Sequence, residues 1–350
     1  MSENAELDPW PAEELESVPN CPVCGGGDRE LLHQDLTDRV FRVAPGVWTL
    51  YRCRGCRSAW LDPRPSPESL GMAYASYYTH DASDHPIVRR LGLLRTLLHD
   101  ALNGYMNARY GLRRKQAFWP GRWLIPLLPN LRAAADAECR HMPRPPSGGG
   151  LVLDVGCGNG RFLKLAEEMG WLAEGIDLDP VAVKTARERG FAARCGTIDV
   201  LHEVSERYDA ITLSHVIEHV YDPLSLLRNL YRLLKPGGTL WLETPNLDSL
   251  GHARYGSAWR DLDPPRHLVL FNPQSLADLV RQAGFENLRR HWNGLVVYSV
   301  FAASEAIKEN RDTSSASRNG RPPLGDLLAE LIEAIRPEKR EFITMLVRKP

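Results

Sequence analysis

The feature that most constrains the fold is a glycine-rich turn that follows a short apolar run. Residues 151–155 read Leu-Val-Leu-Asp-Val, and Gly156-Cys157-Gly158-Asn159-Gly160 come directly after them. Glycines allow a strand to turn tightly into a helix and let backbone N–H groups approach a ligand closely. Several kinds of nucleotide-binding protein share such turns, so the turn alone leaves the ligand open.

Strand-like and helix-like segments alternate from this turn onward. Strands are predicted over 151–156, 171–177, 191–195, 208–214, 239–244, 285–292 and 341–348, and helices over 161–169, 181–189, 223–234 and 272–284. Asp179 and Asp222 directly precede two of these helices and fit N-caps. The alternation predicts an α/β fold with a parallel sheet covered by helices on both faces. Ligands bind such sheets beyond the carboxyl ends of the strands.

Two carboxylates narrow the choice of ligand. Asp154 precedes the turn, where it can meet a cationic amino group, whereas a phosphate-binding turn gains nothing from an acid there. Asp177 lies 23 residues later, at the end of the second strand, and can accept both ribose hydroxyls. Gly196 and Thr197, after the third strand, could border an adenine.

These motifs together resemble class I S-adenosylmethionine-dependent methyltransferases. The matching segments occur in the family's order at 153–160, 175–177, 208–211 and 234–238, and the resemblance covers about residues 148–350. It implies a Rossmann-like seven-stranded sheet and S-adenosylmethionine as cofactor. The cofactor-binding residues that it implies are Asp154, Gly156, Cys157, Gly158, Asn159, Gly160, Asp177, Leu178, Gly196, Thr197, Ser214, His215 and Val216.

Residues 1–62 form an acidic tail and two CxxC pairs. Cys21 and Cys24 are separated from Cys53 and Cys56 by 28 residues. Four thiolates can close a tetrahedral shell around zinc, and with no open position the ion would be structural. We expect a zinc ribbon with short strands at 40–43 and 48–52. Unligated cysteines are the alternative; a redox role is disfavoured because redox CxxC pairs begin a helix.

Residues 63–147 are predicted to be a helical connector or substrate lid. Leu91, Leu94, Leu98, Leu102 and Tyr105 share one helical face. Between residues 86 and 132, nine Lys or Arg residues accompany one acid, a local charge of +8. With the aromatic and leucine residues of 118–128, this segment fits peripheral contact with an anionic membrane or ligand. The alternative is a connector whose arginines are solvated. Farther along, a mobile stretch is expected at 311–321, within an insertion at about 294–340.

The whole-chain charge and the N-terminus bear on partners and location. The net charge is −1, which argues against nucleic acid as a partner. Residues 1–20 hold six acids and no basic residue, unlike a signal peptide, and no apolar run is long enough to cross a bilayer. We therefore expect a cytoplasmic protein that could reach the inner membrane surface.

Candidate catalytic residues follow the fourth and fifth strands of the predicted sheet. Methyl transfer to a hydroxyl needs an oriented acceptor and a base for its proton. His215, Glu218 and His219 follow the fourth strand, and Arg266 and His267 follow the fifth. Either histidine cluster could supply the base, although His219 could instead cap or pack the next helix. Arg266 is expected to bind an anionic acceptor or to orient a neighbour.

A narrower resemblance covers most of the chain. Residues 259–271, the cysteine pairs, residues 61–65 and the tyrosines after them are similar to bacterial zinc-ribbon methyltransferases of sugars and cell-surface glycans. In related sugar C-methyltransferases a Glu-His pair and tyrosines serve the acceptor, which implies roles for Glu218, His219, Tyr74 and Tyr77. In ubiquinone-pathway O-methyltransferases this Glu-His neighbourhood is linked to a divalent ion. Ser214 stands where those enzymes tend to have an acid, so no catalytic metal is assigned.

The leading expectation is methylation of a hydroxyl oxygen of a sugar or glycan acceptor, with methylation on carbon as the second choice. The acceptor could be nucleotide- or lipid-linked, with the basic segment receiving its phosphate. One alternative is an isoprenoid quinone, a peptide or another secondary metabolite. A second is RNA gripped by the zinc ribbon, and a third is a binding module without turnover. Nothing in the sequence indicates the oligomeric state.

Overall fold

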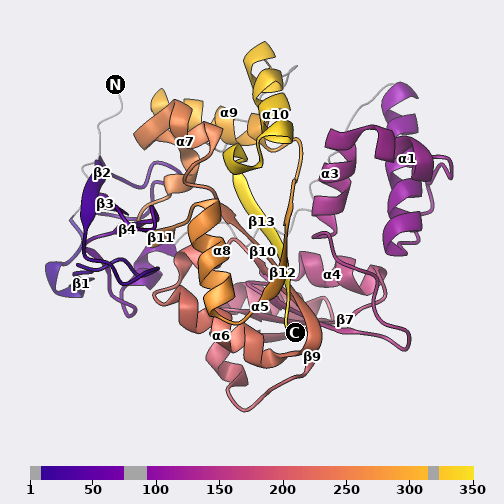
Figure 1. The fold of residues 1–350 in the computed structure, drawn as a ribbon, viewed down its shortest axis with the longest axis horizontal. Helices are drawn as coiled ribbons and strands as arrows, with labels where there is room; N and C mark the ends of the chain where they lie inside the picture. Colours follow the sequence, from indigo (N-terminus) through magenta and orange to yellow (C-terminus); the bar gives the residue numbers. More distant parts are fainter. Residues whose placement is uncertain (1–8, 75–92, 314–322) are drawn as a thin grey trace.

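A seven-stranded sheet forms the centre of the computed structural model, which describes residues 9–74, 93–313 and 323–350 (Figure 1). The strand order is β12-β13-β10-β9-β6-β7-β8. The strands are β6 (Leu151–Val155), β7 (Leu172–Asp177), β8 (Ala192–Cys195), β9 (Tyr208–Ser214), β10 (Leu234–Pro245), β12 (Glu286–His291) and β13 (Phe342–Arg348). The predicted Rossmann-like sheet is confirmed.

The prediction of a wholly parallel sheet is wrong at one strand. β13 runs antiparallel to both β10 and β12. β13 is the last strand in the sequence, and it lies between β10 and β12 in the sheet. Mixed sheets of this kind are common among α/β proteins.

Helices cover both faces of the sheet, as predicted. Two buried clusters mark these faces: one contains residues of α4 and α5, and the other contains residues of α6 and α8. Asp179, Asp222 and Asn272 cap three of the helices, each accepting backbone N–H groups of the first turn. The helices of this half are α4 (Arg161–Glu168), α5 (Pro180–Glu188), α6 (Pro223–Leu233), α7 (Leu250–Tyr255), α8 (Pro273–Gln282), α9 (Val297–Lys308) and α10 (Leu324–Ile335).

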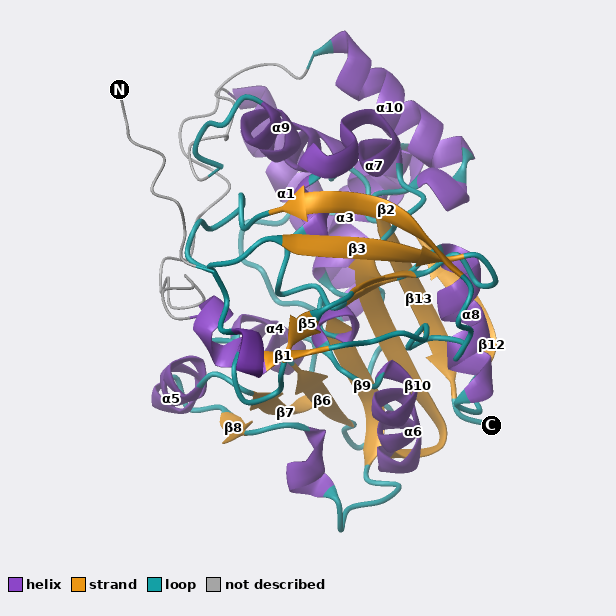
Figure 2. Ribbon diagram, turned by 90° about the vertical axis from the view of Figure 1, so that its left-hand side faces the viewer, coloured by secondary structure: helices purple, strands orange, loops and turns teal. Residues whose placement is uncertain are grey.

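The N-terminal part forms a separate four-stranded sheet with the order β11-β4-β3-β2. Its strands are β2 (Arg29–Leu36), β3 (Trp48–Cys53), β4 (Ala59–Leu61) and β11 (Val269–Leu270). β11 comes from the C-terminal half, so this sheet joins the two halves of the chain. A further pair, β1 (Leu15–Glu16) and β5 (Arg64–Pro65), lies outside both larger sheets. Figure 2 shows β2 and β3 crossing below α7 and α9.

The predicted ribbon strand at 40–43 is wrong. The partner of β3 is β2, and residues 40–43 form a turn. The carboxylate of Asp38 accepts hydrogen bonds from the backbone N–H groups of Phe41, Val43 and Ala44 at 3.0, 2.9 and 2.9 Å. These N–H groups are therefore satisfied locally and do not join a strand ladder.

The connector contributes α1 (Leu93–Tyr110), α2 (Gly121–Leu124) and α3 (Pro129–Glu138). Asp136 ties α1 to α3 by accepting hydrogen bonds from the hydroxyls of Tyr105 and Tyr110 at 2.8 and 2.7 Å. Tyr105 is buried, and Leu98 and Leu102 pack against the same cluster, as their spacing predicted. Leu91 and most of the stretch 311–321 lie outside the described residues. Among the residues described, no helix has the length and apolarity required to cross a bilayer.

Candidate functional site

The glycine-rich turn lies at the carboxyl end of β6, as predicted. Gly156, Gly158 and Gly160 have φ values of +78°, +51° and +83°, in the region that favours glycine. A Cβ atom on Gly156 would collide with the side chain of Val216, so the turn packs directly against the residues after β9. Any larger residue at Gly156 would separate these two parts of the site.

Asp177 is held beside this turn. Its carboxylate accepts the backbone N–H of Gly158 at 2.7 Å and the backbone N–H of Asp179 at 2.9 Å. The carboxylate thus sits at the end of β7 in the position expected for a ribose ligand. Leu178, the next residue, is largely exposed, as are Val181 and Val200.

The remaining predicted cofactor residues gather around the turn with different orientations. The Cys157 side chain is buried and points toward Gly175, so it offers the cofactor only its backbone. Gly196 lies against Val200, and the hydroxyl of Thr197 caps the next turn by accepting the N–H of Asp199. Asn159 is half-buried, and its carbonyl accepts a hydrogen bond from Arg189.

Asp154 is fully buried and is paired with an arginine that the sequence did not single out. Its Oδ1 forms an ion pair with Arg140 and accepts the hydroxyl of Thr212 at 2.9 Å. Arg140 follows α3 and lies over the ring of Phe162, with its guanidinium 3.7 Å from the ring centroid. The helical connector therefore places a cation inside the candidate cofactor site.

The second carboxylate oxygen of Asp154 provides a test of cofactor fit. Oδ2 is buried and has no hydrogen-bond partner. Burial raises the pKa of Asp154, and the charge of Arg140 opposes that shift. A buried acceptor without a partner costs about 1–3 kcal/mol, which an ammonium group at this position would relieve. The amino group of S-adenosylmethionine fits this donor requirement, and the exposed aliphatic groups near Asp177 fit its adenine.

His219 and His267 face each other at the carboxyl ends of the strands. Their ring centroids are 4.8 Å apart. The Nδ1 of His219 lies 2.9 Å from the carbonyl oxygen of Arg266, and the Nδ1 of His267 lies 2.8 Å from that of Asp261. Since a carbonyl accepts only, each Nδ1 carries a proton and donates it. In the neutral ring the Nε2 is then the proton acceptor.

The environment of His219 keeps it uncharged. Burial, together with nearby His267, lowers the pKa of His219 to about 4. The hydroxyl of Tyr74 lies 3.2 Å from its Nδ1, so the structure brings together three of the predicted residues, Tyr74, Glu218 and His219. Tyr77 lies outside the described residues.

His215 has a different electrostatic role from His219. Its Nδ1 lies 3.2 Å from Glu218 and its Nε2 lies 3.4 Å from Glu243. Burial opposes its charged form, but the hydrogen bonds and charges of the two glutamates raise the pKa of His215 to about 10. Burial likewise opposes ionisation of Glu218, whose pKa falls to about 2 because of His215. At neutral pH His215 is thus an imidazolium and has no lone pair to act as a base.

Arg266 does not face an acceptor. It is fully buried, and its guanidinium binds Asp38 at 2.5 Å, Asp263 at 2.7 Å and the carbonyl of Ala73 at 3.0 Å. The idea that Arg266 binds an anionic acceptor is therefore corrected, because these contacts occupy the guanidinium. The other predicted role stands, since Arg266 fixes the loop that carries His267 and its carbonyl orients His219.

Within the described part of the chain, two groups of side chains could hold a metal. The first is Glu218, His219 and His267, whose ligand atoms lie within 4.8 Å of one another. Each Glu218 oxygen accepts one hydrogen bond, from His215 or Thr244, and keeps a second lone pair with which it could bind a metal. The second group is the four cysteines.

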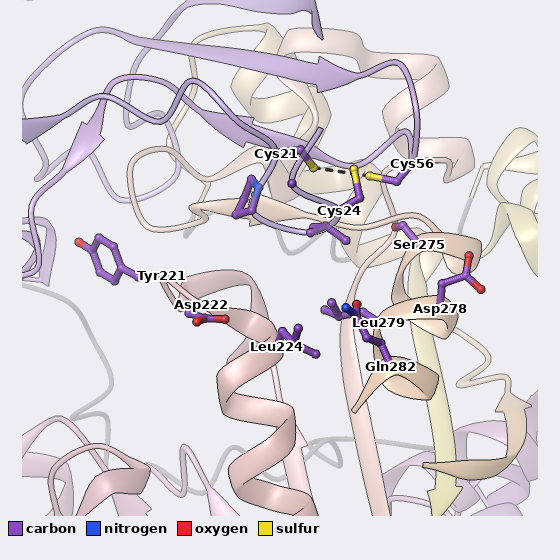
Figure 3. A pocket seen from close by; sticks show the side chains of 13 residues that line it. Cys21, Cys24, Cys56, Tyr221, Asp222, Leu224, Ser275, Asp278, Leu279 and Gln282 are labelled. Carbon is purple, nitrogen blue, oxygen red and sulfur yellow. Dashed lines mark hydrogen bonds between the residues drawn. The ribbon is translucent and has the colours of Figure 1, made fainter. Parts of the chain in front are cut away.

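The cysteine cluster matches tetrahedral zinc. The Sγ atoms of Cys21 and Cys56 are 3.5 Å apart, as are those of Cys24 and Cys53. Zinc–sulfur bonds of about 2.3 Å in a tetrahedron place sulfurs about 3.8 Å apart, so the four thiolates need to move little. One side of the cluster borders a cavity of about 660 Å³ whose other wall is made by α6 and α8 (Figure 3).

Several residues of the site were missed from the sequence. They are Asp38, Arg140, Thr212, Glu243, Thr244, Asp263 and Asn293. Apart from Asp263, which contacts Arg266 three residues away, each is remote in sequence from the segment it contacts or lies inside a strand, where an acid or a threonine is common. Arg140 lies within the predicted helical connector, residues 63–147, but outside the basic stretch between residues 86 and 132.

Comparison with known proteins supports the assignment of the domain. A methyltransferase domain family matches residues 130–290. A ubiquinone biosynthesis O-methyltransferase of Xanthomonas oryzae pv. oryzae is 40% identical over 105 residues, 28% of this chain and 44% of that protein. One from Cereibacter sphaeroides is 34% identical over 157 residues, 41% of this chain and 64% of that protein. The chain therefore spans about half to two thirds of the curated relatives it matches.

A solved structure has a similar arrangement at lower identity. A SAM-dependent methyltransferase from Archaeoglobus fulgidus is 22% identical, with a TM-score of 0.43, covering 63% of this chain and 93% of that one. The family match and the strand order agree on the same segment. The segment that matches the methyltransferase domain family contains β6 to β10 of the Rossmann-like sheet.

Proposed function

We propose that this protein transfers a methyl group from S-adenosylmethionine to a hydroxyl oxygen of an isoprenoid quinone precursor. The observation that carries the proposal is the uncharged His219, whose Nε2 remains available because Nδ1 is committed to the Arg266 carbonyl. The curated relatives are named for ubiquinone biosynthesis, which favours the quinone alternative over the sugar acceptor first expected.

The cofactor would be bound by residues from both halves of the site. When bound, it supplies a methyl group on a positively charged sulfur. Asp154 would accept its amino group through Oδ2, and Asp177 would accept the ribose hydroxyls. Arg140 carries the charge needed to bind the cofactor's carboxylate, so the connector would contribute directly to cofactor affinity.

Different residues of the chain would deprotonate the acceptor and orient the base. His219 takes the hydroxyl proton at Nε2, and the Arg266 carbonyl holds the ring in the required tautomer. A phenol ionises near pH 10 and an alcohol is closer to water, at about 15.7, so a phenolic acceptor asks less of a weakly basic imidazole. The choice of a quinone precursor rests on the named relatives. His215, a cation between Glu218 and Glu243, neutralises part of their charge and holds both carboxylates in place beside His219.

A sugar acceptor is retained as the second candidate because of one contact. Tyr74, from the connector, reaches His219, as the resemblance to sugar methyltransferases implies. The distinguishing experiment incubates the purified protein with methyl-labelled S-adenosylmethionine and a fractionated cell extract. Label that stays in the solvent-extractable lipid after acid hydrolysis has released any linked sugar supports the quinone precursor, whereas label in released saccharide or in RNA rejects it. Cofactor binding without transfer to any fraction would indicate a binding module.

A further inference from the structure

α10 is an amphipathic helix with its leucine face turned outward. Its three charged residues, Asp326, Glu330 and Glu333, are all buried. Five of its six large apolar residues are at least half exposed, and the sixth, Ile332, is partly buried; the five are Leu324, Leu327, Leu328, Leu331 and Ile335. This arrangement is the reverse of that in an ordinary surface helix, which buries its apolar stripe.

Specific contacts of the acids fix this orientation. Glu330 accepts the backbone N–H groups of Leu295 and Val297, both at 3.1 Å, and so caps the start of α9. Glu333 accepts the backbone N–H of Glu341 and the indole N–H of Trp292. Turning the leucines inward would break these hydrogen bonds and expose the groups that they satisfy. The leucine face is therefore held outward by the fold.

A second exposed apolar surface lies on the connector, in and around α2. It consists of Phe118, Trp119, Trp123, Leu124, Leu127 and Leu128, all more than 40% exposed. Trp119 and Trp123 pack edge to face with ring centroids 4.4 Å apart, and the guanidinium of Arg122 lies over both rings. These bulky groups are thus arranged around a cation at the surface.

The loop 294–295 links the two surfaces. Leu295, which is half exposed, is bonded to Glu330 of α10. The preceding Gly294 packs against the N-terminal turn of α3, where an added Cβ would lie 2.5 Å from the carbonyl oxygen of Asn130. Figure 1 shows α10 and the α1–α3 helices on the same upper part of the molecule. We call the combined surface the α10–α2 face.

Charge identifies the occupant of this face. Residues 101–135 contain six Lys or Arg residues and no acid. Arg113, Lys115, Arg122 and Arg132 of this stretch are exposed, Arg122 lies over both tryptophan rings, and α10 exposes no acid to oppose them. Leucines and tryptophans bordered by arginines are the composition of surfaces that insert into the headgroup region of anionic bilayers. A two-fold pairing of copies would instead bring like charges together.

We infer that the α10–α2 face docks the protein on an anionic membrane surface, with the leucines and tryptophans entering the headgroup layer. The inferred membrane docking does not depend on the proposed methyl transfer. It would hold for any acceptor, and its test does not require turnover.

The test is cosedimentation of the full chain with vesicles of phosphatidylcholine alone or with phosphatidylglycerol added. We expect binding to the anionic vesicles that weakens as salt rises. Leu327→Gln with Leu331→Gln should reduce the partition coefficient by about tenfold or more. Arg122→Gln should reduce it by about fivefold and flatten the salt dependence. Leu31→Gln changes a similarly exposed leucine on β2 and should leave binding unchanged.

Cofactor affinity, measured by calorimetry, should be unchanged in all these variants, which separates a docking defect from misfolding or a failed methyltransferase assignment. Absence of binding to anionic vesicles would overturn the inference, as would equal losses in Leu31→Gln and the α10 variant. A dimer in solution that the α10 variant dissociates, without vesicle binding, would assign the face to a second copy instead.

Discussion

The Nδ1 of His219 lies 2.9 Å from the carbonyl oxygen of Arg266. This contact places the proton of the neutral ring on Nδ1 and leaves Nε2 as an acceptor. Arg266 itself is held by Asp38 from the N-terminal part and by Asp263. The tautomer of the candidate base thus depends on an arginine that joins the two halves of the chain.

Replacement of His219 tests its role as the base. We expect His219→Gln to lower the transfer rate by about 10²- to 10⁴-fold, the usual contribution of a general base. Affinity for S-adenosylmethionine, measured by calorimetry, should stay within experimental error. Tyr74→Phe removes only a hydroxyl beside the ring and serves as the milder control. An unchanged rate in His219→Gln would assign that histidine to packing of the helix turn.

The pH dependence of transfer should show a broad plateau. His219 must be uncharged, so the rate should rise as pH passes its pKa of about 4. His215 must be charged, so the rate should fall as pH passes its pKa of about 10. The profile is obtained from initial rates at saturating cofactor, over the range in which circular dichroism shows the fold intact. A rate that rises steadily across neutral pH would contradict this assignment.

Cofactor binding should depend on Asp177 more than on its neighbours. Asp177→Ala removes the acceptor of the ribose hydroxyls, and we expect the dissociation constant for S-adenosylmethionine to rise by about tenfold or more. Asp199→Ala, a nearby acid outside the predicted ribose contact, is the matched control. Equal affinity in the wild type and in Asp177→Ala would refute the ribose role.

Zinc content tests the ribbon. We expect about one zinc ion per chain in the purified protein and its loss in Cys21→Ser, because the thiolate is replaced by a weaker ligand. Elemental analysis measures the stoichiometry. Cys195→Ser, an exposed cysteine far along the chain from the CxxC pairs, should retain the metal. Full zinc occupancy in Cys21→Ser would show that Cys21 is not a zinc ligand and would contradict the four-cysteine site.

The stability of the folded protein should depend on buried Arg266, which binds Asp38 of the N-terminal part and Asp263 of the C-terminal half. Asp38→Asn removes one carboxylate from a fully buried guanidinium, and we expect a loss of about 3 kcal/mol in the free energy of unfolding by urea. Burial opposes ionisation of Asp38, but its contacts with Arg266 hold its pKa below the usual value. The stability it contributes is therefore complete above the usual pKa of an aspartate and is lost as pH falls through the lower folded value. A variant as stable as the wild type would show that the ion pair contributes little.

The sequence was sufficient for the seven strands of the central sheet, the helices α4, α5, α6 and α8, and the glycine-rich turn, because these depend on local patterns. It did not predict α7, α9 or α10. Asp179 and Asp222 were recognisable as caps from their position before a helix. The direction of β13 was not predictable, since it depends on where the returning chain finds open strand edges. The turn at 40–43 was mistaken for a strand because the hydrogen bonds of Asp38 are invisible in an apolar pattern.

The candidate site, too, could be predicted only where it depends on local sequence patterns. Asp154 and Asp177 could be placed by their distance from the turn, but Arg140 reaches Asp154 only through the packing of the connector. Glu218 and Glu243 keep His215 charged, whereas burial keeps His219 uncharged. Two histidines four residues apart have no sequence feature that separates these roles.

The most direct test of the central claim is incubation of the purified protein with S-adenosylmethionine and a hydroxylated isoprenoid quinone precursor, followed by mass spectrometry of both products. The account predicts one methyl ether for each S-adenosylhomocysteine formed, and a strong loss of both in His219→Gln. Methylation on carbon, or no S-adenosylhomocysteine with this acceptor while a saccharide is methylated, would contradict it.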